Sequence, residues 1–149
     1  MQAPLVSPAM ILLPSSFGDI TATAHIAHLI YNTLRDSTGS SSNYKSLIEE
    51  LHSFENALHF IGQVLKATPV SDSVCQDIEA ESTRCHEMLQ KFWDSIQQYE
   101  VILSRRWSLR AIWCKIIWAI LKPKEVASFR WMLLQHKLNI EVFLIMLGM

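Results

Sequence analysis

Between Tyr44 and Leu103 apolar residues recur at spacings of three and four, with one interruption at Thr68 and Pro69. This spacing places the apolar residues on one face of an α-helix. Pro69 ends the first of the two helices because the residue before a proline is pushed out of the helical region. The 149-residue chain holds only four glycines and five prolines, so long unbroken helices are expected. The predicted fold class is all-α, a single bundle of four to five mostly antiparallel helices.

The first helix is predicted to start near Ser16, which can cap it, and to run to about Asp36. Asp19 is placed favourably against the positive end of the helix dipole. Residues 1–15 are expected to form a flexible lead-in, and residues 16–149 the helical-bundle domain. The inward face of this helix is rich in alanine and should consist of Ile20, Ala24, Ala27, Tyr31 and Leu34.

Caps and breakers delimit the later helices. We expect them from Ser42 or Asn43 to Thr68, from Ser71 or Asp72 to Leu103, from Trp107 to Leu121 and from about Lys124 to Leu147. A break of the long third helix near Glu81 to Arg84 is an open alternative. The polar face of the second helix is expected to hold Glu49, Glu50, His52, Glu55, Asn56 and Gln63. The last helix can turn inward Val126, Phe129, Leu133, Ile140, Phe143 and Leu147.

Charge is divided unevenly along the chain. Residues 1–100 carry five lysines and arginines against twelve acids, and residues 101–149 carry eight against two. A basic part of this kind can dock on the acidic part of the same chain or contact an anionic partner. The cations gather among tryptophans in the stretch RRWSLRAIWCKIIWAILKPKEV. We predict a contact surface for a protein or a lipid here, formed by Arg105, Arg106, Arg110, Trp113, Lys115, Trp118, Lys122 and Lys124.

This stretch has more than one interpretation. Tryptophan and isoleucine at helical spacing are typical of a core, so a central helix with a cationic margin is the leading one. Indoles flanked by cations are also what an interfacial helix uses against anionic lipid. Arg110 and Lys115 interrupt the apolar run before it reaches the roughly 18 to 20 residues of a membrane span. They also lie about 140° apart around a helix, so they form no clean basic stripe, and nucleic-acid binding is not expected.

The sequence carries no motif that is typical of catalysis. Each glycine is isolated, so no glycine-rich phosphate loop is present. Cys85 stands beside His86, but neighbouring residues of a helix point about 100° apart and do not face each other, which argues against a nucleophile and its base. We therefore expect no enzyme, no catalytic residues and no cofactor.

The histidines offer two weak metal-binding patterns. Glu49 and His52 form the E-x-x-H pair that di-iron bundles use, but the second pair is missing and both residues lie on a polar face. His25 and His28 are one turn apart, yet no cysteine or acid cluster completes a tetrahedral set. We expect solvent exposure or interhelical hydrogen bonds, and no metal site. The three cysteines, without metal-ligand spacing, are typical of reduced thiols inside a cell.

Four phrases follow one another between Ser16 and Gly148: SFGDI, DSTGSSSNYKSLIEEL, LKPKEV and FRWMLLQHKLNIEVFLIMLG. In this order they resemble an N-terminal helical domain that is common in filamentous fungi and often precedes a ubiquitin-like domain. Asn43 stands where that family usually has an acid, and Pro123 where it has a lysine-like residue. The chain is also distantly similar to the HeLo-like and NACHT-associated N-terminal bundles of fungal NLR-like proteins.

The resemblance implies a role without implying any catalytic residue. We expect a non-enzymatic helical-bundle module for protein association and signalling inside a fungal cell. Its partner would be another protein or a second copy of the chain. The alternative is a membrane-associating cell-death effector, which would use the basic aromatic helix at residues 107–121 against an anionic membrane surface.

Overall fold

Helices account for nearly all of the described chain. The structure, a computed structural model, describes residues 8–35, 42–106 and 121–148, with side chains for 19–35, 44–97 and 121–148. The helices are α1 (Pro8–Arg35), α2 (Ser42–Ala67), α3 (Asp72–Arg106) and α5 (Pro123–Met146). These ranges contain no strand, and the predicted all-α fold class is confirmed.

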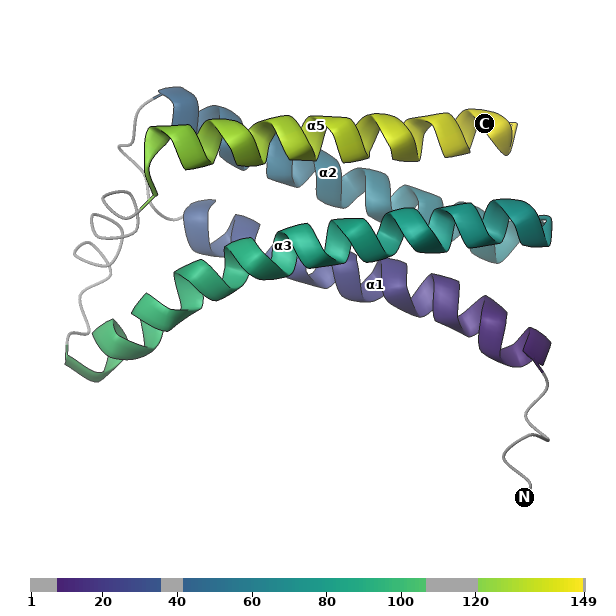
Figure 1. Ribbon diagram of the computed structural model, residues 1–149, viewed down its shortest axis with the longest axis horizontal. Helices are drawn as coiled ribbons and strands as arrows, with labels where there is room; N and C mark the ends of the chain where they lie inside the picture. Colours follow the sequence, from purple (N-terminus) through teal and green to yellow (C-terminus); the bar gives the residue numbers. More distant parts are fainter. Residues whose placement is uncertain (1–7, 36–41, 107–120, 149) are drawn as a thin grey trace, which may run out of the picture.

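Consecutive described helices run in opposite directions (Figure 1). Helix α1 packs against α2 and α3, and α5 packs against α2 and, less extensively, against α3. Figure 1 also shows that α3 diverges from α5 toward the end of the bundle where α3 ends and α5 begins. Helix α5 therefore lies at one edge of the bundle, with α2 and α3 on its inner side.

Helix α1 begins at Pro8, upstream of the start that we predicted at Ser16. Proline is well tolerated in the first turn, where its missing N–H has no helical partner in any case. The helix also continues through Pro14, which removes one backbone hydrogen bond without ending it. Residues 8–15, predicted as part of a lead-in, thus belong to the helix.

Helix α2 has the boundaries that the sequence predicts, and α3 starts as predicted but runs to Arg106, three residues past the predicted end at Leu103. Helix α2 ends at Ala67, just before Pro69. Helix α3 is capped by Ser71, whose hydroxyl accepts a hydrogen bond from the backbone N–H of Val74 at 3.4 Å. It continues as one helix of 35 residues, so the alternative of a break near Glu81 is not adopted.

The core is built from apolar side chains of all four helices. The alanines of α1 allow close approach: Ala24 and Ala27 are buried, as predicted, while Tyr31 is only half-buried. The most deeply buried large side chains are Phe54, Ile20, Ile30, Leu34, Leu47, Leu51, Leu58, Ile61, Leu89 and Leu133. Most of these residues follow the predicted stripes, but Ile30 of α1 is fully buried although it was not placed on the predicted inward face.

Helix α5 begins at Pro123, one residue before the predicted start, again with proline in the first turn. Leu121 just ahead of it is buried, and its carbonyl accepts a hydrogen bond from the hydroxyl of Tyr44 at 3.1 Å. This bond ties the entry to α5 to the first turn of α2. The predicted helix at residues 107–121 otherwise lies outside the described residues.

None of the described helices combines the length and the apolar character needed to cross a bilayer.

Candidate functional site

Helix α5 has two apolar faces. Its inner face consists of the buried residues Val126, Phe129, Leu133 and Ile140. On its other side five large apolar residues are exposed, and we call them the outer stripe: Trp131, Leu134, Leu138, Val142 and Ile145. At about 100° of rotation per residue, the outer stripe covers only about 80° of the helix surface, and its centre lies about 150° from that of the inner face. The stripe therefore points away from the core.

The exposure of the outer stripe is high. Trp131 is 59% exposed and Ile145 is 70% exposed. Among the described residues, the exposed large hydrophobics are Phe60 on α2 and seven residues of α5, which are the stripe together with Met132 and Met146. Scattered apolar residues on a surface are ordinary, whereas a contiguous patch indicates a contact site.

Three contacts hold the opposite side of α5 on the bundle. The rings of Phe92 and Phe129 stack with centroids 3.9 Å apart, joining α3 to α5. Arg130 donates two hydrogen bonds to Glu50 of α2, from Nε to Oε1 at 2.7 Å and from Nη2 to Oε2 at 3.0 Å. Hydrogen bonding to this carboxylate raises the pKa of Arg130. The third contact is centred on Glu81.

Glu81 is a buried carboxylate at the α3–α5 boundary, only 2% exposed. Its Oε1 accepts hydrogen bonds from Arg84 at 2.8 Å and from Asn139 at 3.2 Å. Its Oε2 accepts one from Nδ1 of His136 and one from the thiol of Cys85 at 3.6 Å. His136 and Asn139 belong to α5, so the carboxylate joins the two helices.

These donors change the acidity of the cluster. Burial by itself raises the pKa of Glu81, but the hydrogen bonds from His136, Arg84 and Asn139 outweigh burial and lower that pKa to about 2. The neighbouring thiol responds in the opposite sense: burial, and then the negative charge of Glu81, raise the pKa of Cys85. Cys85 therefore remains a protonated thiol near neutral pH, which makes it a poor nucleophile.

Glu81, Cys85 and His136 also meet the first requirement of a metal site. One ligand atom from each lies within 4.8 Å of the others, and zinc accepts this combination of ligands. However, both oxygens of Glu81 already accept hydrogen bonds, and the guanidinium of Arg84 adds positive charge beside them. An ion would also have to displace a thiol proton that burial retains. We interpret the cluster as a hydrogen-bond network that fastens α5 to α3.

A second buried carboxylate lies between α1 and α2. Glu55, which we predicted on a polar face, is only 7% exposed, and this prediction was wrong. Nδ1 of His28 donates to its Oε2 at 3.0 Å, and Nε2 of His59 lies 3.2 Å from the same oxygen. His28 thus makes the interhelical hydrogen bond that we expected. His25, Glu49 and His52 are exposed, as expected of a solvated face.

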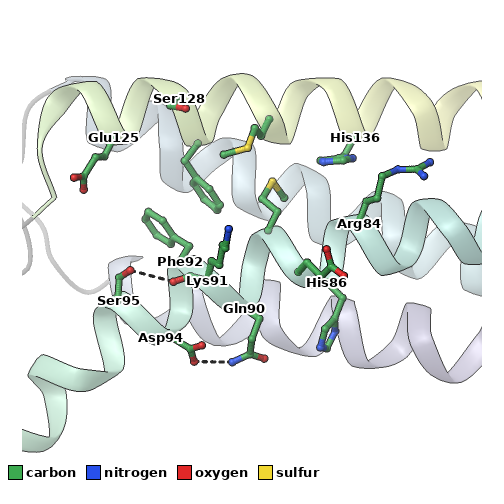
Figure 2. Close-up of a pocket in the computed structure, with 14 residues that line it drawn as sticks. Arg84, His86, Gln90, Lys91, Phe92, Asp94, Ser95, Glu125, Ser128 and His136 are labelled. Atoms are coloured by element: carbon green, nitrogen blue, oxygen red, sulfur yellow. Dashed lines mark hydrogen bonds between the residues drawn. The ribbon is translucent and has the colours of Figure 1, made fainter.

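An open groove of ≈ 770 Å³ lies between α3 and α5, where the two helices diverge (Figure 2). Phe92, Met88, Phe129 and Met132 give it an apolar lining, and charged residues of both signs surround them. Some of the polar groups drawn there form local hydrogen bonds: Gln90 donates to Asp94 at 2.8 Å, and Ser95 donates to a backbone carbonyl at 3.0 Å (Figure 2). The groove is an apolar surface between helices and gathers few convergent polar groups.

The predicted basic contact surface is described only in small part. Lys122 and Lys124 are exposed at the start of α5. Arg105 and Arg106 are the last two residues of α3, and their side chains lie outside the described residues. Four further members of the predicted surface lie entirely outside the described ranges: Arg110, Trp113, Lys115 and Trp118.

Sequence reasoning missed the outer stripe, although a signal was present. Apolar residues occur on α5 at 131, 134, 138, 142 and 145, in addition to the inward set. A helix that carries two apolar stripes cannot bury both against one bundle, so the second stripe predicts a further contact. Glu81 also left a signal, because it occupies a position of the apolar stripe between Ile78 and Cys85.

Comparisons of the chain with protein-family models, with curated proteins and with solved structures find no match. The resemblance to the fungal helical domain therefore stays a prediction.

Proposed function

We propose that this chain is a non-enzymatic helical module that associates with protein through the outer stripe of α5. The observation that carries the proposal is the exposure of five large apolar residues on one narrow face of a helix whose opposite face is already packed. Burying such a face against another protein removes apolar surface from water, which is the main driving force of association. A signalling role inside a fungal cell, which the resemblance implies, is part of this proposal.

The size of the apolar patch supports the proposal. With roughly half of each side chain exposed, the five residues of the outer stripe and the adjoining Met146 present on the order of 600 Å² of surface. Monomeric proteins rarely expose contiguous apolar patches larger than a few hundred Å². One partner of a standard protein–protein interface buries about 800 Å². The stripe can therefore form most of such an interface once its polar margins are included.

A second candidate function is association with an anionic membrane. Its support is the pair Lys122 and Lys124, which are exposed at the start of α5, about two turns before the first residue of the stripe. Glu125 and Glu141 are exposed on the same helix and would oppose an anionic surface. We favour protein association because an interfacial helix combines its apolar face with a strongly cationic polar face, which α5 lacks.

The test compares Leu138→Glu with the control Gln63→Glu, which adds the same charge at an exposed position of α2. Proteins that co-purify with the chain from its native cells are quantified for each variant, and far-UV circular dichroism confirms folding. We expect Leu138→Glu to lose the associated proteins and Gln63→Glu to keep them. Unchanged association for Leu138→Glu would contradict the proposal.

The same variants distinguish the second candidate. Each is sedimented with vesicles of phosphatidylcholine alone and with vesicles that also contain phosphatidylserine, at low salt. Under protein association, none of the variants sediments with either vesicle. Binding of the wild-type chain to the anionic vesicles, lost in Leu138→Glu, would replace the first function with the second.

A further inference from the structure

The residue spacing of the outer stripe is the same whether it is counted from its first residue or from its last. From Trp131 to Ile145 the steps are three, four, four and three, with Leu138 at the centre. A second α5 that runs antiparallel across Leu138 therefore presents the same stripe at the same heights. A surface that matches itself after a rotation of 180° is what the interface of a symmetric dimer requires.

The side chains that meet in this arrangement are complementary in size. Trp131 of one chain lies level with Ile145 of the other, Leu134 lies level with Val142, and the two copies of Leu138 meet at the symmetry axis. The larger residue of each unlike pair thus faces the smaller one, which makes the layers less unequal in volume than like-with-like pairing would. A parallel pair would instead place the two copies of Trp131 together and leave Val142 facing only its copy.

The charges beside the stripe match the same arrangement. Lys137, which is half-buried, and Glu141, which is exposed, lie on one flank of α5. In an antiparallel pair this flank faces the same flank of the second copy, with Glu141 about 3 Å along the axis from the position of the other Lys137. The symmetric interface therefore contains this pair of opposite charges twice, and opposite charges across an interface favour specific pairing.

The chain itself cannot cover the far part of the stripe with the residues between α3 and α5. The last turn of α3 and the first turn of α5 lie at the same end of the bundle (Figure 1). Ile145 lies about 33 Å along α5 from Pro123, so a path out and back needs about 66 Å. The segment 107–120 has 14 residues, which reach at most about 50 Å in any conformation.

We infer that the partner of the outer stripe is a second copy of this chain, with the two α5 helices antiparallel about a two-fold axis at Leu138. The inference rests on the proposed function and names its partner. About 600 Å² from each chain gives a total of about 1,200 Å², which is at the lower limit of stable, specific interfaces. The dimer should therefore dissociate on dilution.

Disulfide trapping tests the geometry. The background carries Cys75→Ser and Cys114→Ser and keeps the buried Cys85. Single cysteines are introduced by Leu138→Cys, by Ile145→Cys and, as a control for random collision, by Gln63→Cys. Bridging requires Cα atoms within about 7 Å. In the antiparallel pair the two copies of residue 138 meet, whereas the two copies of residue 145 lie about 21 Å apart along the axis.

We expect Leu138→Cys to form covalent dimers at least about tenfold faster than Ile145→Cys and Gln63→Cys on mild oxidation. Sedimentation of the wild-type chain should show a species of about 34 kDa, twice the 17.1 kDa of one chain, and Leu138→Glu should abolish it. Equally fast bridging at residues 138 and 145 would indicate parallel packing and overturn the inference. A monomer at all concentrations would also overturn it, whereas protein association through the stripe would still be decided by the co-purification experiment.

Discussion

The inner and outer faces of α5 are made of the same kinds of residue and meet opposite environments. Leu133 and Leu134 are neighbours in the chain, yet Leu133 is 2% exposed and Leu134 is 48% exposed. Leu133 packs in the core, whereas Leu134 belongs to the outer stripe. Apolar residues of one helix thus meet two fates: the inner set stabilises the fold, and the outer set stays exposed on the described chain, where the proposed association would bury it.

Leu133→Ala, on the inner face, should reduce the stability of the chain more than any other change considered. Truncation of a buried leucine loses its transfer free energy and leaves a cavity, so the free energy of unfolding should fall by about 2–5 kcal/mol. Urea unfolding followed by circular dichroism measures the change. A loss below about 1 kcal/mol would mean that the inner face is not packed as described.

Acid should have the second-largest effect, because it weakens the hydrogen bonds that join the inner side of α5 to Glu81. The pKa of Glu81 falls from its ordinary value of 4.5 to about 2 on folding. The stabilisation is therefore complete above about pH 4.5 and is lost as the pH falls toward 2, with a total on the order of 3 kcal/mol. Unfolding free energies measured from pH 6 to pH 2 should fall less steeply in Glu81→Gln than in the wild type. Glu49→Gln, at an exposed carboxylate, is the control and should keep the wild-type slope.

Arg130→Met tests the contact between α5 and α2, with a smaller effect. Arg130 and Glu50 are side chains with exposed fractions of 30% and 41%, so solvent screens their attraction. We expect a loss of at most about 1 kcal/mol, because partly exposed ion pairs contribute little. The difference between Arg130→Met and the wild type should shrink in 1 M salt. A difference that salt leaves unchanged would assign the effect to packing of the arginine stem.

Leu134→Ala should have the smallest effect on the stability of the single chain. Its side chain is about half exposed, and the change should be within about 0.5 kcal/mol when the protein is dilute enough to be monomeric. At high concentration the same variant should lose the stabilisation that dimer formation adds to the wild type. A loss as large as that of Leu133→Ala in the monomer would remove the distinction between the two faces.

The sequence predicted the helices where local signals act alone. Pro69 and Ser71 mark the boundary between α2 and α3, because a proline and a capping hydroxyl act on the backbone next to them. The start of α1 was placed at Ser16 because that residue can cap a helix, whereas the helix accepts Pro8 in its first turn and continues through Pro14. A local signal such as a proline permits either a helix start or a preceding loop, and packing elsewhere in the fold decides between them.

The candidate site was harder to predict than the fold. Glu55 and Glu81 are acids, and periodicity places acids on solvated faces unless their partners are known. His28 and His136 are far away in the sequence, so their contacts with these acids depend on how the helices pack. The outer stripe could have been predicted from the sequence of α5 alone. The contact surface was instead predicted at residues 105–124, because the cations and tryptophans there form a more conspicuous pattern.

The Glu81 cluster has a further consequence for how α5 finds its place. Since both faces of α5 are apolar, burial alone would accept the helix rotated by about half a turn, with Leu138 inside and Leu133 outside. That rotation would carry His136 and Asn139 away and leave Glu81 buried without two of its donors, which is costly for a charged group. The polar atoms thus add to the apolar packing in selecting one orientation of α5 over the other. Replacing His136 and Asn139 with apolar residues of similar size would leave a helical protein with two alternative cores.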